Sequence, residues 1–245
     1  MSDAIGEHRT LVIVPTYNES GSIAEVAQRL FRDDPPFDLL VVDDGSPDGT
    51  ADIVRRLAED DGRIHLLART VKTGLGTAYV AGFRWALDRD YGAVVEMDAD
   101  LSHDPTQVPQ LVAALAEADL AIGSRYVPGG KVVNWGWFRR FLSRFGNLYA
   151  RFWLRFGVAD STSGFRAFRS QAIRDQDLSE VSSHGYAFQI EMCWRVHRTG
   201  GKIVEVPITF TERASGTSKM SRRIVIEALT QVTGWGIKQR FRRKP

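Results

Sequence analysis

The fold class follows from the stretch LLVVDDGSPDGT at residues 39–50. Its first four residues form a short apolar run of the kind found in buried strands. The rest combines Asp, Gly, Ser and Pro, which build turns and cap helices. A helical pattern follows at 50–59. The stretch therefore predicts a strand, a polar turn and a helix, in that order.

The same order repeats on both sides of this stretch. The apolar runs predicted to be strands are residues 10–15, 39–42, 64–68, 93–97, 120–122 and 203–210. The patterns predicted to be helices are residues 22–32, 50–59, 77–89, 105–117 and 220–238. This alternation predicts an α/β fold with a mostly parallel central sheet and helices on both faces. Ligands bind such sheets at the carboxyl ends of the strands.

Length and composition indicate one globular unit. The 245 residues suit a single domain spanning 1–245, and 43% hydrophobic with 25% charged residues is an ordinary globular balance. The single cysteine, Cys193, cannot form an internal disulfide. The amino-terminal residues do not resemble a signal peptide, and no stretch reaches the ~20 apolar residues of a membrane span. We expect a cytoplasmic protein that meets a membrane only peripherally, on its cytoplasmic face.

The small net charge of +2 hides a strong division. Residues 1–119 carry 10 Lys and Arg against 22 Asp and Glu, whereas residues 120–245 carry 22 against 8. The acidic half suits a site that uses cations, and the basic half suits contact with anions. Charge alone does not decide whether the basic half meets a phospholipid surface or nucleic acid. The motifs described below favour a phospholipid surface, and we expect no nucleic-acid partner.

Polar residues follow three of the predicted strands, at 15–19, 43–50 and 98–100. We expect these three strand ends to meet at one edge of the sheet. For Ser46, Asp48 and Thr50 the simpler interpretation, as turn and cap residues, is favoured. It explains Asp98 and Asp100 poorly, because two carboxylates that face one pocket repel each other unless a cation joins them.

The pattern Asp98-Ala99-Asp100 predicts a site for Mg²⁺ or Mn²⁺. Two carboxylates suit oxygen ligation of such an ion, whose remaining positions go to water and phosphate oxygens. An ion that bridges a diphosphate neutralises charge on a departing nucleotide. Such an acidic pair is common by itself, but its position beside two other polar strand ends makes the prediction specific.

Seven motifs give the chain a family resemblance. They are PTYNE (15–19), DDGSPDGT (43–50), GLGTA (74–78), DADLSH (98–103), GSRY (123–126), DSTSGFR (160–166) and RASGTSK (213–219). The chain resembles the family 2 glycosyltransferases with the GT-A fold, and among them the polyprenol- or dolichol-phosphate mannose synthases. The resemblance covers about residues 10–219. It implies a GT-A-type nucleotide-binding sandwich and the inverting transfer of mannose from GDP-mannose to a polyprenyl monophosphate.

The resemblance also implies roles for individual residues. Those matching the nucleotide-sugar site are Pro15, Tyr17, Glu19, Val42, Asp44, Asp98, Ala99, Asp100, Arg213 and Lys219. The metal ligands implied are Asp98, Asp100 and Ser102, the last standing where the family often has Gln. Catalytic roles fall to Asp100, Arg125, Arg213 and Lys219. The acceptor phosphate is assigned to Arg125, to Arg139 or Arg140, and to Ser143.

Three further features of the sequence allow two interpretations each. Lys219 can be a solvated lysine before a helix instead of a lysine that closes over the diphosphate. Glu191 can be a base for a hydroxyl acceptor, or it can pair with Arg195 one helical turn away. The glycines of Gly74-Leu75-Gly76 lack the third glycine of a dinucleotide fingerprint. We therefore interpret them as a loop that lets the backbone pass near the donor.

Residues 132–156 hold nine aromatic residues, five arginines and no acid. At ~100° per residue, four arginines fall on one stripe and most of the aromatic residues on another. This composition is typical of a helix lying in a membrane interface. The alternative is a helix that packs its aromatic residues on the sheet or on another subunit. Residues 220–245 repeat the pattern more weakly, with an apolar face and a basic tail.

A lipid phosphate acceptor changes the chemistry required. Its oxygen is already anionic at neutral pH, so no general base is needed, and cations must instead bring two anions together. Two alternatives keep the binding site: the same chemistry with UDP-glucose or another nucleotide sugar, and a non-catalytic nucleotide-sugar-binding subunit. The partners expected are GDP-mannose, polyprenyl phosphate and a membrane surface, with a separate membrane-anchoring protein left open.

Overall fold

The computed structural model describes residues 9–181, 183, 185–212 and 222–242. Its central sheet has seven strands in the order β3-β2-β1-β4-β7-β5-β8. These strands are β1 (Thr10–Thr16), β2 (Phe37–Asp43), β3 (Ile64–Ala68), β4 (Ala93–Glu96), β5 (Leu120–Ser124), β7 (Arg166–Arg169) and β8 (Ile203–Pro207). β1 pairs in parallel with β2 and β4, β2 with β3, and β5 with β8. The mostly parallel α/β sheet is therefore confirmed.

Two features of the sheet differ from the sequence-based expectation. β7 was not predicted, and it runs antiparallel between β4 and β5. The prediction of a single strand at 203–210 is wrong, because the chain leaves the central sheet at Ile208 and enters a second sheet. The Ile208 amide donates to the Ser124 carbonyl of β5, and its carbonyl accepts from the Lys131 amide. The next strand, β9 (Thr209–Thr211), pairs in parallel with β6 (Lys131–Val133) in a separate two-stranded sheet.

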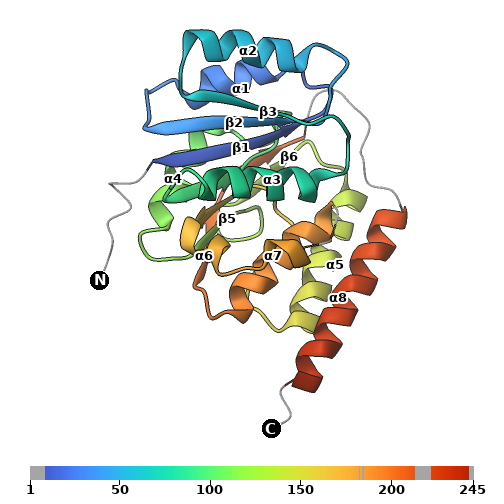
Figure 1. Cartoon of the computed structure of the whole chain (residues 1–245). Coiled ribbons are helices and arrows are strands. Elements are labelled where there is room, and N and C mark those ends of the chain that lie inside the picture. The colour runs from blue at the N-terminus through green and yellow to red at the C-terminus, as the bar shows by residue number, and fades with distance from the viewer. Residues whose placement is uncertain (1–8, 182, 184, 213–221, 243–245) are drawn as a thin grey trace.

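Helices cover both faces of the central sheet (Figure 1). Leu11 and Ile13 of β1 point into one core, and Val12 and Val14 point into the other. A strand buried on both faces gives a continuous apolar run in the sequence, as β1 does. The first core includes α3 (Leu75–Leu87) and α7 (Tyr186–Arg198), and the second includes α1 (Ile23–Leu30), α2 (Thr50–Asp60) and α4 (Val108–Ala114). The shorter elements are α6 (Ser170–Arg174), η2 (Pro105–Gln107) and η3 (Leu178–Glu180).

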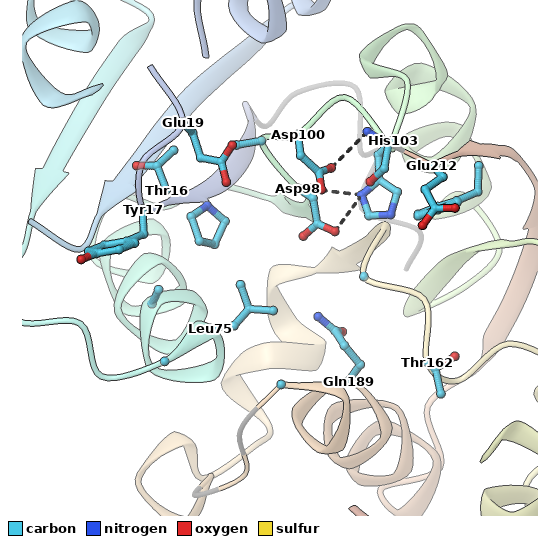
Figure 2. A pocket seen from close by; sticks show the side chains of 18 of the residues that line it. Thr16, Tyr17, Glu19, Leu75, Asp98, Asp100, His103, Thr162, Gln189 and Glu212 are labelled. Atoms are coloured by element: carbon cyan, nitrogen blue, oxygen red, sulfur yellow. Dashed lines mark hydrogen bonds and ion pairs between the residues drawn. The ribbon is translucent and has the colours of Figure 1, made fainter. Parts of the chain in front are cut away.

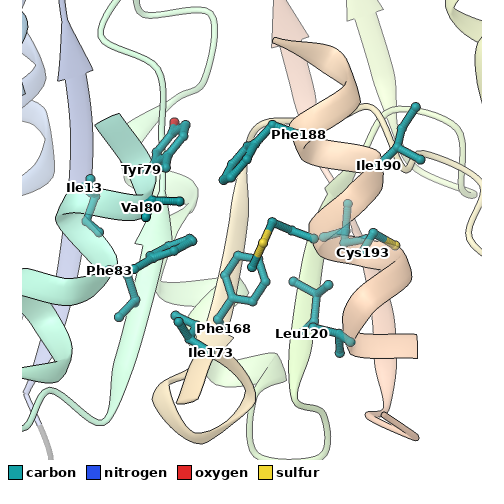
Figure 3. Close-up of a cluster of buried hydrophobic side chains, with 14 of the residues drawn as sticks. Ile13, Tyr79, Val80, Phe83, Leu120, Phe168, Ile173, Phe188, Ile190 and Cys193 are labelled. Carbon is teal, nitrogen blue, oxygen red and sulfur yellow. The ribbon is translucent and has the colours of Figure 1, made fainter. Parts of the chain in front are cut away.

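Aromatic packing joins α3 to α7 in the first core (Figure 3). The ring of Tyr79 stacks on Phe188 at 5.8 Å, and Phe83 meets Phe168 edge-on at 5.7 Å. Such pairs contribute beyond the apolar area they bury. Cys193 lies in the same core, where burial raises the pKa of its thiol to about 12. It is therefore a packing residue at neutral pH.

The two glycines of the 74–76 motif have different roles. Gly74 precedes α3 with a φ of 109° and lines the cavity described below, as expected for a loop near a ligand. Gly76 lies inside α3, so the interpretation as loop is wrong for this residue. An ideal Cβ at Gly76 would lie 2.6 Å from the Ser183 carbonyl oxygen and 2.9 Å from Phe188 Cδ2. Gly76 therefore permits close packing of α3 against α7.

Gly76→Ala should lower the free energy of unfolding by about 1–3 kcal/mol, since an overpacked core must shift to relieve a clash with backbone. Urea denaturation of the purified protein measures the change. Gly62→Ala is the matched control, because an ideal Cβ there meets nothing within 4 Å. A Gly76→Ala protein as stable as Gly62→Ala would contradict the packing role.

Helices α5 (Trp137–Leu154) and α8 (Arg222–Arg242) pack against each other below the sheet (Figure 1). Tyr149 of α5 shares a hydrogen bond of 2.5 Å with Thr233 of α8. Trp194 of α7 stacks on Trp235 at 5.5 Å, and its indole N–H donates to Gln239 at 3.0 Å. These contacts attach α8 to both α5 and α7.

The aromatic stripe of α5 faces solvent in this chain. The exposed members are Trp137, Phe138, Phe141, Phe145, Leu148 and Phe152, with exposed fractions from 44% to 79%. The alternative that these side chains pack on the sheet is therefore wrong. Phe156, which belongs by helical spacing to the same predicted stripe, follows the end of α5 and is buried in the core. In the part of the chain that the structure describes, no helix is long and apolar enough to cross a membrane.

Candidate active site

A cavity of about 410 Å³ lies at the carboxyl ends of β1, β2 and β4 (Figure 2). The polar ends of these three neighbouring strands meet there, as predicted. The predicted donor and metal residues that line it are Pro15, Tyr17, Glu19, Asp44, Asp98, Ala99, Asp100 and Ser102. Arg125 and Arg139 also line it, from the basic half of the chain. The cavity thus joins the acidic and the basic half.

Two of the predicted residues, Val42 and Arg140, do not line the cavity. The Val42 side chain is fully buried in the core and does not line the cavity. The Arg140 guanidinium donates to the Val132 carbonyl at 3.0 Å and is likewise not among the lining residues. Arg213 and Lys219 lie outside the residues that the structure describes.

Ser46, Asp48 and Thr50 are turn residues, as the simpler interpretation predicted, but no side chain caps α2, whose N-cap is Gly49. The three residues also hold the loops after β1 and β2 together. Ser46 Oγ accepts from the Asn18 amide at 3.0 Å, and Thr50 Oγ1 accepts from the Glu19 amide at 3.1 Å. Asp48 accepts from the Ser20 amide at 3.0 Å. These bonds fix the loop that presents Tyr17 and Glu19 to the cavity.

One end of the cavity combines an aromatic ring, a cation and a carboxylate. Lys72 Nζ lies 3.6 Å from the centre of the Tyr17 ring. The Asp44 carboxylate lies 3.1 Å from an Arg69 guanidinium nitrogen. Burial raises the pKa of Asp44, and Arg69 opposes this rise. A flat ring beside polar groups of both charges can hold a nucleobase, and the sequence did not indicate Lys72 or Arg69 for it.

The acidic pair sits on a loop that is tied down on both sides. Asp100 accepts from the Ser102 amide at 3.1 Å, and the Asp98 amide donates to His103 Nδ1 at 3.2 Å. The His103 ring stacks on Phe165 at 5.0 Å, and burial lowers its pKa to about 4, so a neutral imidazole accepts this bond. Leu101 adopts a φ of 60°, an uncommon conformation for a bulky residue that places strain beside the two carboxylates.

The donor groups at this loop fit a hard divalent cation. Asp98, Asp100 and Ser102 line the cavity and offer oxygen atoms. Within the described ranges, no group of three or more His, Cys, Asp or Glu side chains is arranged to hold a metal ion. Mg²⁺ is ordinarily held by one or two carboxylates together with water and substrate phosphates. The two carboxylates are therefore suited to an ion shared with a diphosphate.

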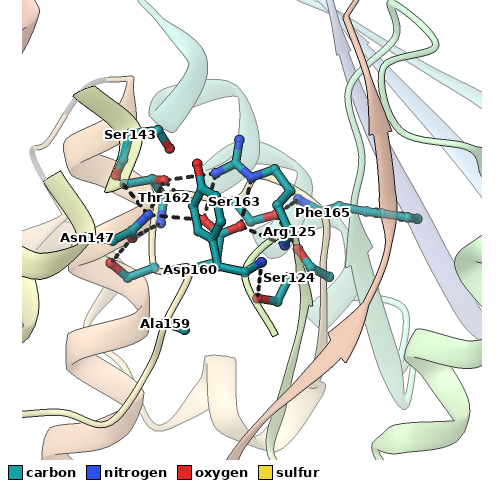
Figure 4. A network of polar contacts seen from close by, with 12 residues as sticks. Ser124, Arg125, Ser143, Asn147, Ala159, Asp160, Thr162, Ser163 and Phe165 are labelled. Carbon is teal, nitrogen blue, oxygen red and sulfur yellow. Dashed lines mark hydrogen bonds and ion pairs between the residues drawn. The ribbon is translucent and has the colours of Figure 1, made fainter. Parts of the chain in front are cut away.

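A buried ion pair forms the opposite wall (Figure 4). Asp160 accepts from Arg125 Nε at 2.7 Å, from Nη2 at 2.6 Å and from the Arg125 amide at 2.9 Å. Asn147 of α5 donates to the same carboxylate at 3.3 Å. Burial would raise the pKa of Asp160, yet Arg125 holds it below the ordinary value. The Arg125 guanidinium is thus fixed in place, and only the motif at 160–166 pointed to Asp160 in the sequence.

A narrow groove of about 80 Å³ continues from this wall between α5 and α8. It shares Arg125, Trp135, Arg139 and Thr162 with the larger cavity. Its other residues are mostly apolar: Leu142, Ser143, Phe145, Gly146, Tyr149, Ile190, Val225, Ala228, Leu229 and Val232. Arg139 pairs with Glu212 and lies 4.7 Å from the centre of the Trp135 ring. The cavity with the paired carboxylates therefore opens past cationic side chains into an apolar groove.

Residues 11–176 match the family model Glycosyl transferase family 2. The chain belongs to glycosyltransferase family 2. It is 52% identical over 233 residues to an undecaprenyl-phosphate mannosyltransferase of Micrococcus luteus, covering 95% of this chain and 96% of that protein. It is 52% identical over 237 residues to a polyprenol monophosphomannose synthase of Mycolicibacterium smegmatis, covering 96% and 89%.

Solved structures show the same fold at low sequence identity. A glucosyl-3-phosphoglycerate synthase from Mycobacterium tuberculosis superposes with a TM-score of 0.69 at 21% identity, covering 95% of this glycosyltransferase and 82% of that chain. A mannosyltransferase from Pyrobaculum calidifontis, in complex with GDP-Man and Mn²⁺, superposes with a TM-score of 0.60 at 19% identity, covering 97% and 65%. The predicted GT-A-type fold is thereby confirmed.

In this glycosyltransferase Glu191 pairs with Arg195 within α7 and does not face the cavity as a base would. Arg195 Nε donates to its carboxylate at 2.7 Å, and Ser183 Oγ also donates to it. Glu191 is buried and is not among the residues that line the cavity. The pairing with Arg195 is confirmed, and nothing in the described geometry presents Glu191 to a substrate hydroxyl.

Proposed function

We propose that this glycosyltransferase transfers mannose from GDP-mannose to a polyprenyl monophosphate. The observation that carries the proposal is the continuity between a cavity bearing two carboxylates and an apolar groove lined by Arg139. A nucleotide sugar suits the first space and a lipid phosphate suits the second. The two relatives at 52% identity, whose names specify mannosyl transfer and polyprenyl acceptors, support the same function.

The donor is proposed to lie along the strand ends. Tyr17, Lys72 and Asp44 would hold the nucleobase, and Asp98 and Asp100 would hold the divalent cation at the diphosphate. When bound, Mg²⁺ or Mn²⁺ supplies charge neutralisation on the departing nucleoside diphosphate. The structure of the Pyrobaculum calidifontis mannosyltransferase with GDP-Man and Mn²⁺ supports this donor and metal pairing.

The acceptor phosphate is proposed to sit where the cavity meets the groove. Arg125 and Arg139 line this junction, Ser143 lines the groove beside it, and the prenyl chain would enter the apolar part between α5 and α8. A phosphate oxygen is anionic at neutral pH, so attack on the anomeric carbon needs orientation and cations instead of a base. Direct in-line attack inverts that carbon and gives a β-linked product from an α-linked donor.

Arg139→Ala is expected to raise the KM for polyprenyl phosphate at least about tenfold, because a charge-assisted hydrogen bond to phosphate contributes about 1.5–3 kcal/mol. Initial rates at varied acceptor and saturating GDP-mannose measure it. Arg140→Ala is the matched control, since the Arg140 guanidinium bonds the Val132 carbonyl and does not line the junction. Equal effects of the two substitutions would contradict the choice of Arg139.

We also propose that the single domain of residues 1–245 rests peripherally on the cytoplasmic face of a membrane, through interface helices at about 132–156 and 220–245. The exposed rings of α5 support this placement, as does the groove that opens between α5 and α8. Aromatic side chains at acyl-headgroup depth and arginines at lipid phosphates are the usual partners of such a surface.

Replacing both Phe141 and Phe152 with Ser should lower retention on vesicles of mixed anionic phospholipid at least about tenfold. Each ring is more than half exposed, and burying such a ring in lipid contributes about 1.5–3 kcal/mol. Cosedimentation with vesicles measures the change. Val71→Ser removes an exposed apolar residue outside α5 and α8 and should leave retention unchanged. Unaltered cosedimentation of the double variant would contradict the placement of α5.

A donor panel tests the proposed reaction. Purified protein is mixed with labelled polyprenyl phosphate, Mg²⁺ or Mn²⁺, and either GDP-mannose or UDP-glucose. Mannose transfer from GDP-mannose is the expected result. Transfer that occurs from a UDP-sugar alone would overturn the proposed donor while keeping the chemistry, and nucleotide-sugar binding without any transfer would favour a non-catalytic subunit.

A further inference from the structure

The Gln189 side chain rises from α7 into the cavity and points toward Asp98 (Figure 2). It is 2% exposed, and within the described residues neither its Nε2 nor its Oε1 makes a hydrogen bond of ordinary geometry, although the carboxamide lies near enough to the buried Glu96 carboxyl to lower the pKa of that group. A buried carboxamide whose hydrogen-bonding capacity is left unfilled is costly, so native proteins seldom keep one without a reason. Here the remaining partners can come from the cavity that Gln189 lines.

Gly164 keeps a space open between this carboxamide and the acidic pair. An ideal Cβ at Gly164 would lie 3.7 Å from Gln189 Nε2, 3.8 Å from Asp98 Oδ1 and 3.6 Å from His103 Cε1. Two groups from the loop after β4 and one from α7 thus converge on the point that a side chain at 164 would occupy. A ligand atom that enters beside this point meets Gln189 and Asp98 together.

A buried guanidinium fixes the position of Gln189. Arg166 donates to the Gln189 carbonyl at 2.5 Å, to the Ser161 carbonyl at 2.5 Å and to the Ser163 carbonyl at 2.7 Å. One fully buried side chain therefore joins the first turns of α7 to the loop that contains Gly164. Glu96 pairs with Arg166 in the sheet and is also buried. Burial raises the pKa of Glu96, and Arg166 and, to a lesser degree, the nearby Gln189 carboxamide oppose this rise. The backbone at Gln189 is thus fixed before any ligand arrives.

The chemistry of a carboxamide selects among the parts of a nucleotide sugar. It is neutral and offers both a donor and an acceptor, which matches a hydroxyl group. The diphosphate and its cation call for charged partners, and the cavity provides these in Asp98, Asp100 and Arg125. Figure 2 shows Gln189 below Asp98 and well away from the Tyr17 ring at the left. A donor with its nucleobase at Tyr17 and its diphosphate at the acidic pair would bring its sugar within reach of Gln189.

We propose that Gln189 hydrogen-bonds a hydroxyl of the transferred hexose and so determines sugar specificity. This inference rests on the proposed function, in which a nucleotide sugar fills the cavity. It assigns the nucleoside and the diphosphate to other residues. Loss of the carboxamide should therefore weaken the binding of a nucleotide sugar much more than the binding of its nucleoside diphosphate.

Equilibrium binding of GDP-mannose and of GDP, each with Mn²⁺ and without acceptor, tests this difference. Gln189→Leu should raise the Kd for GDP-mannose about tenfold and change the Kd for GDP less than about twofold. Gly164→Ala is a second variant for the same space, since its methyl group makes ordinary van der Waals contacts and leaves the fold intact. It should also weaken GDP-mannose selectively. Gln176→Leu is the control, because Gln176 is a buried glutamine that bonds the Ala172 carbonyl away from the cavity.

Equal losses for both ligands in Gln189→Leu, or no loss for either, would overturn the role of Gln189. A selective loss of the same size in Gln176→Leu would overturn it as well. A failure of the proposed function can be told apart from a failure of this inference. The donor panel would show it in the wild-type protein, as transfer from a UDP-sugar alone. In that case UDP-glucose and UDP replace the two ligands, and the same ratio of Kd values decides the role of Gln189.

Discussion

Asp100→Asn should lower kcat/KM for mannose transfer at least about a hundredfold, since removal of one group that stabilises charge in a transition state costs about that much. The substitution keeps an oxygen that can accept from the Ser102 amide, a bond of 3.1 Å in the wild-type loop. It removes the negative charge that a divalent cation needs. The loss should therefore come from cation and diphosphate binding and not from collapse of the loop. Initial rates at increasing Mn²⁺ measure it.

Asp104→Asn is the matched control for this prediction. Asp104 lies four residues further along, caps η2 by accepting from the Thr106 amide at 3.1 Å, and does not line the cavity. An asparagine can cap in the same way, so rates should stay within about twofold of wild type. Near-normal turnover of Asp100→Asn at saturating Mn²⁺ would show that the acidic pair does not hold the cation.

Asp160→Ala should lower the free energy of unfolding by about 3–5 kcal/mol, because it leaves a buried guanidinium without its counter-ion. Asp160 is fully buried, and Arg125 is 7% exposed. The substitution removes three hydrogen bonds to Arg125 and the bond from Asn147, which also joins α5 to this wall. Denaturation in urea measures the loss. Asp52→Ala breaks an exposed pair with Arg55 and should change stability by less than about 1 kcal/mol.

The pH dependence of this pair has a definite sign. The pKa of Asp160 in the folded state is below its ordinary value, which is about 3.9 in the unfolded chain. The stability that the ionised pair contributes is therefore complete above that pH and is lost as the pH falls through the lowered pKa. The difference in stability between wild type and Asp160→Ala should narrow below about pH 4. A difference that stays constant down to pH 2 would contradict the ion pair as its source.

The sequence predicted features that depend on periodicity and strand ends. β1, β2 and β4 read as apolar runs because both faces of the sheet are covered, and Asp44, Asp98 and Asp100 follow them directly. The exposed stripe of α5 was predictable for the same reason, since helical spacing separates its aromatic residues from its arginines. Local pattern and side-chain chemistry sufficed in these places.

Features made by contacts between distant segments could not be predicted in this way. β7 is four residues long, and its antiparallel position depends on β4 and β5. Lys72 reaches the cavity from the segment before α3, and Gln189 reaches it from α7. In the sequence each is a single polar residue without a pattern around it. The sequence could not distinguish Arg139 from Arg140 as the proposed phosphate ligand. The structure favours Arg139, because the Arg140 guanidinium bonds the Val132 carbonyl.

The groove between α5 and α8 has a consequence for how the proposed reaction would be controlled. Its volume of about 80 Å³ is far below the roughly 300–1,000 Å³ of a pocket that encloses a drug-sized molecule. A polyprenyl phosphate held there would keep most of its hydrocarbon in the bilayer and would never leave the membrane during turnover. Enzyme and acceptor would then meet by lateral diffusion in two dimensions. The surface density of the lipid, and not its bulk concentration, would set the rate.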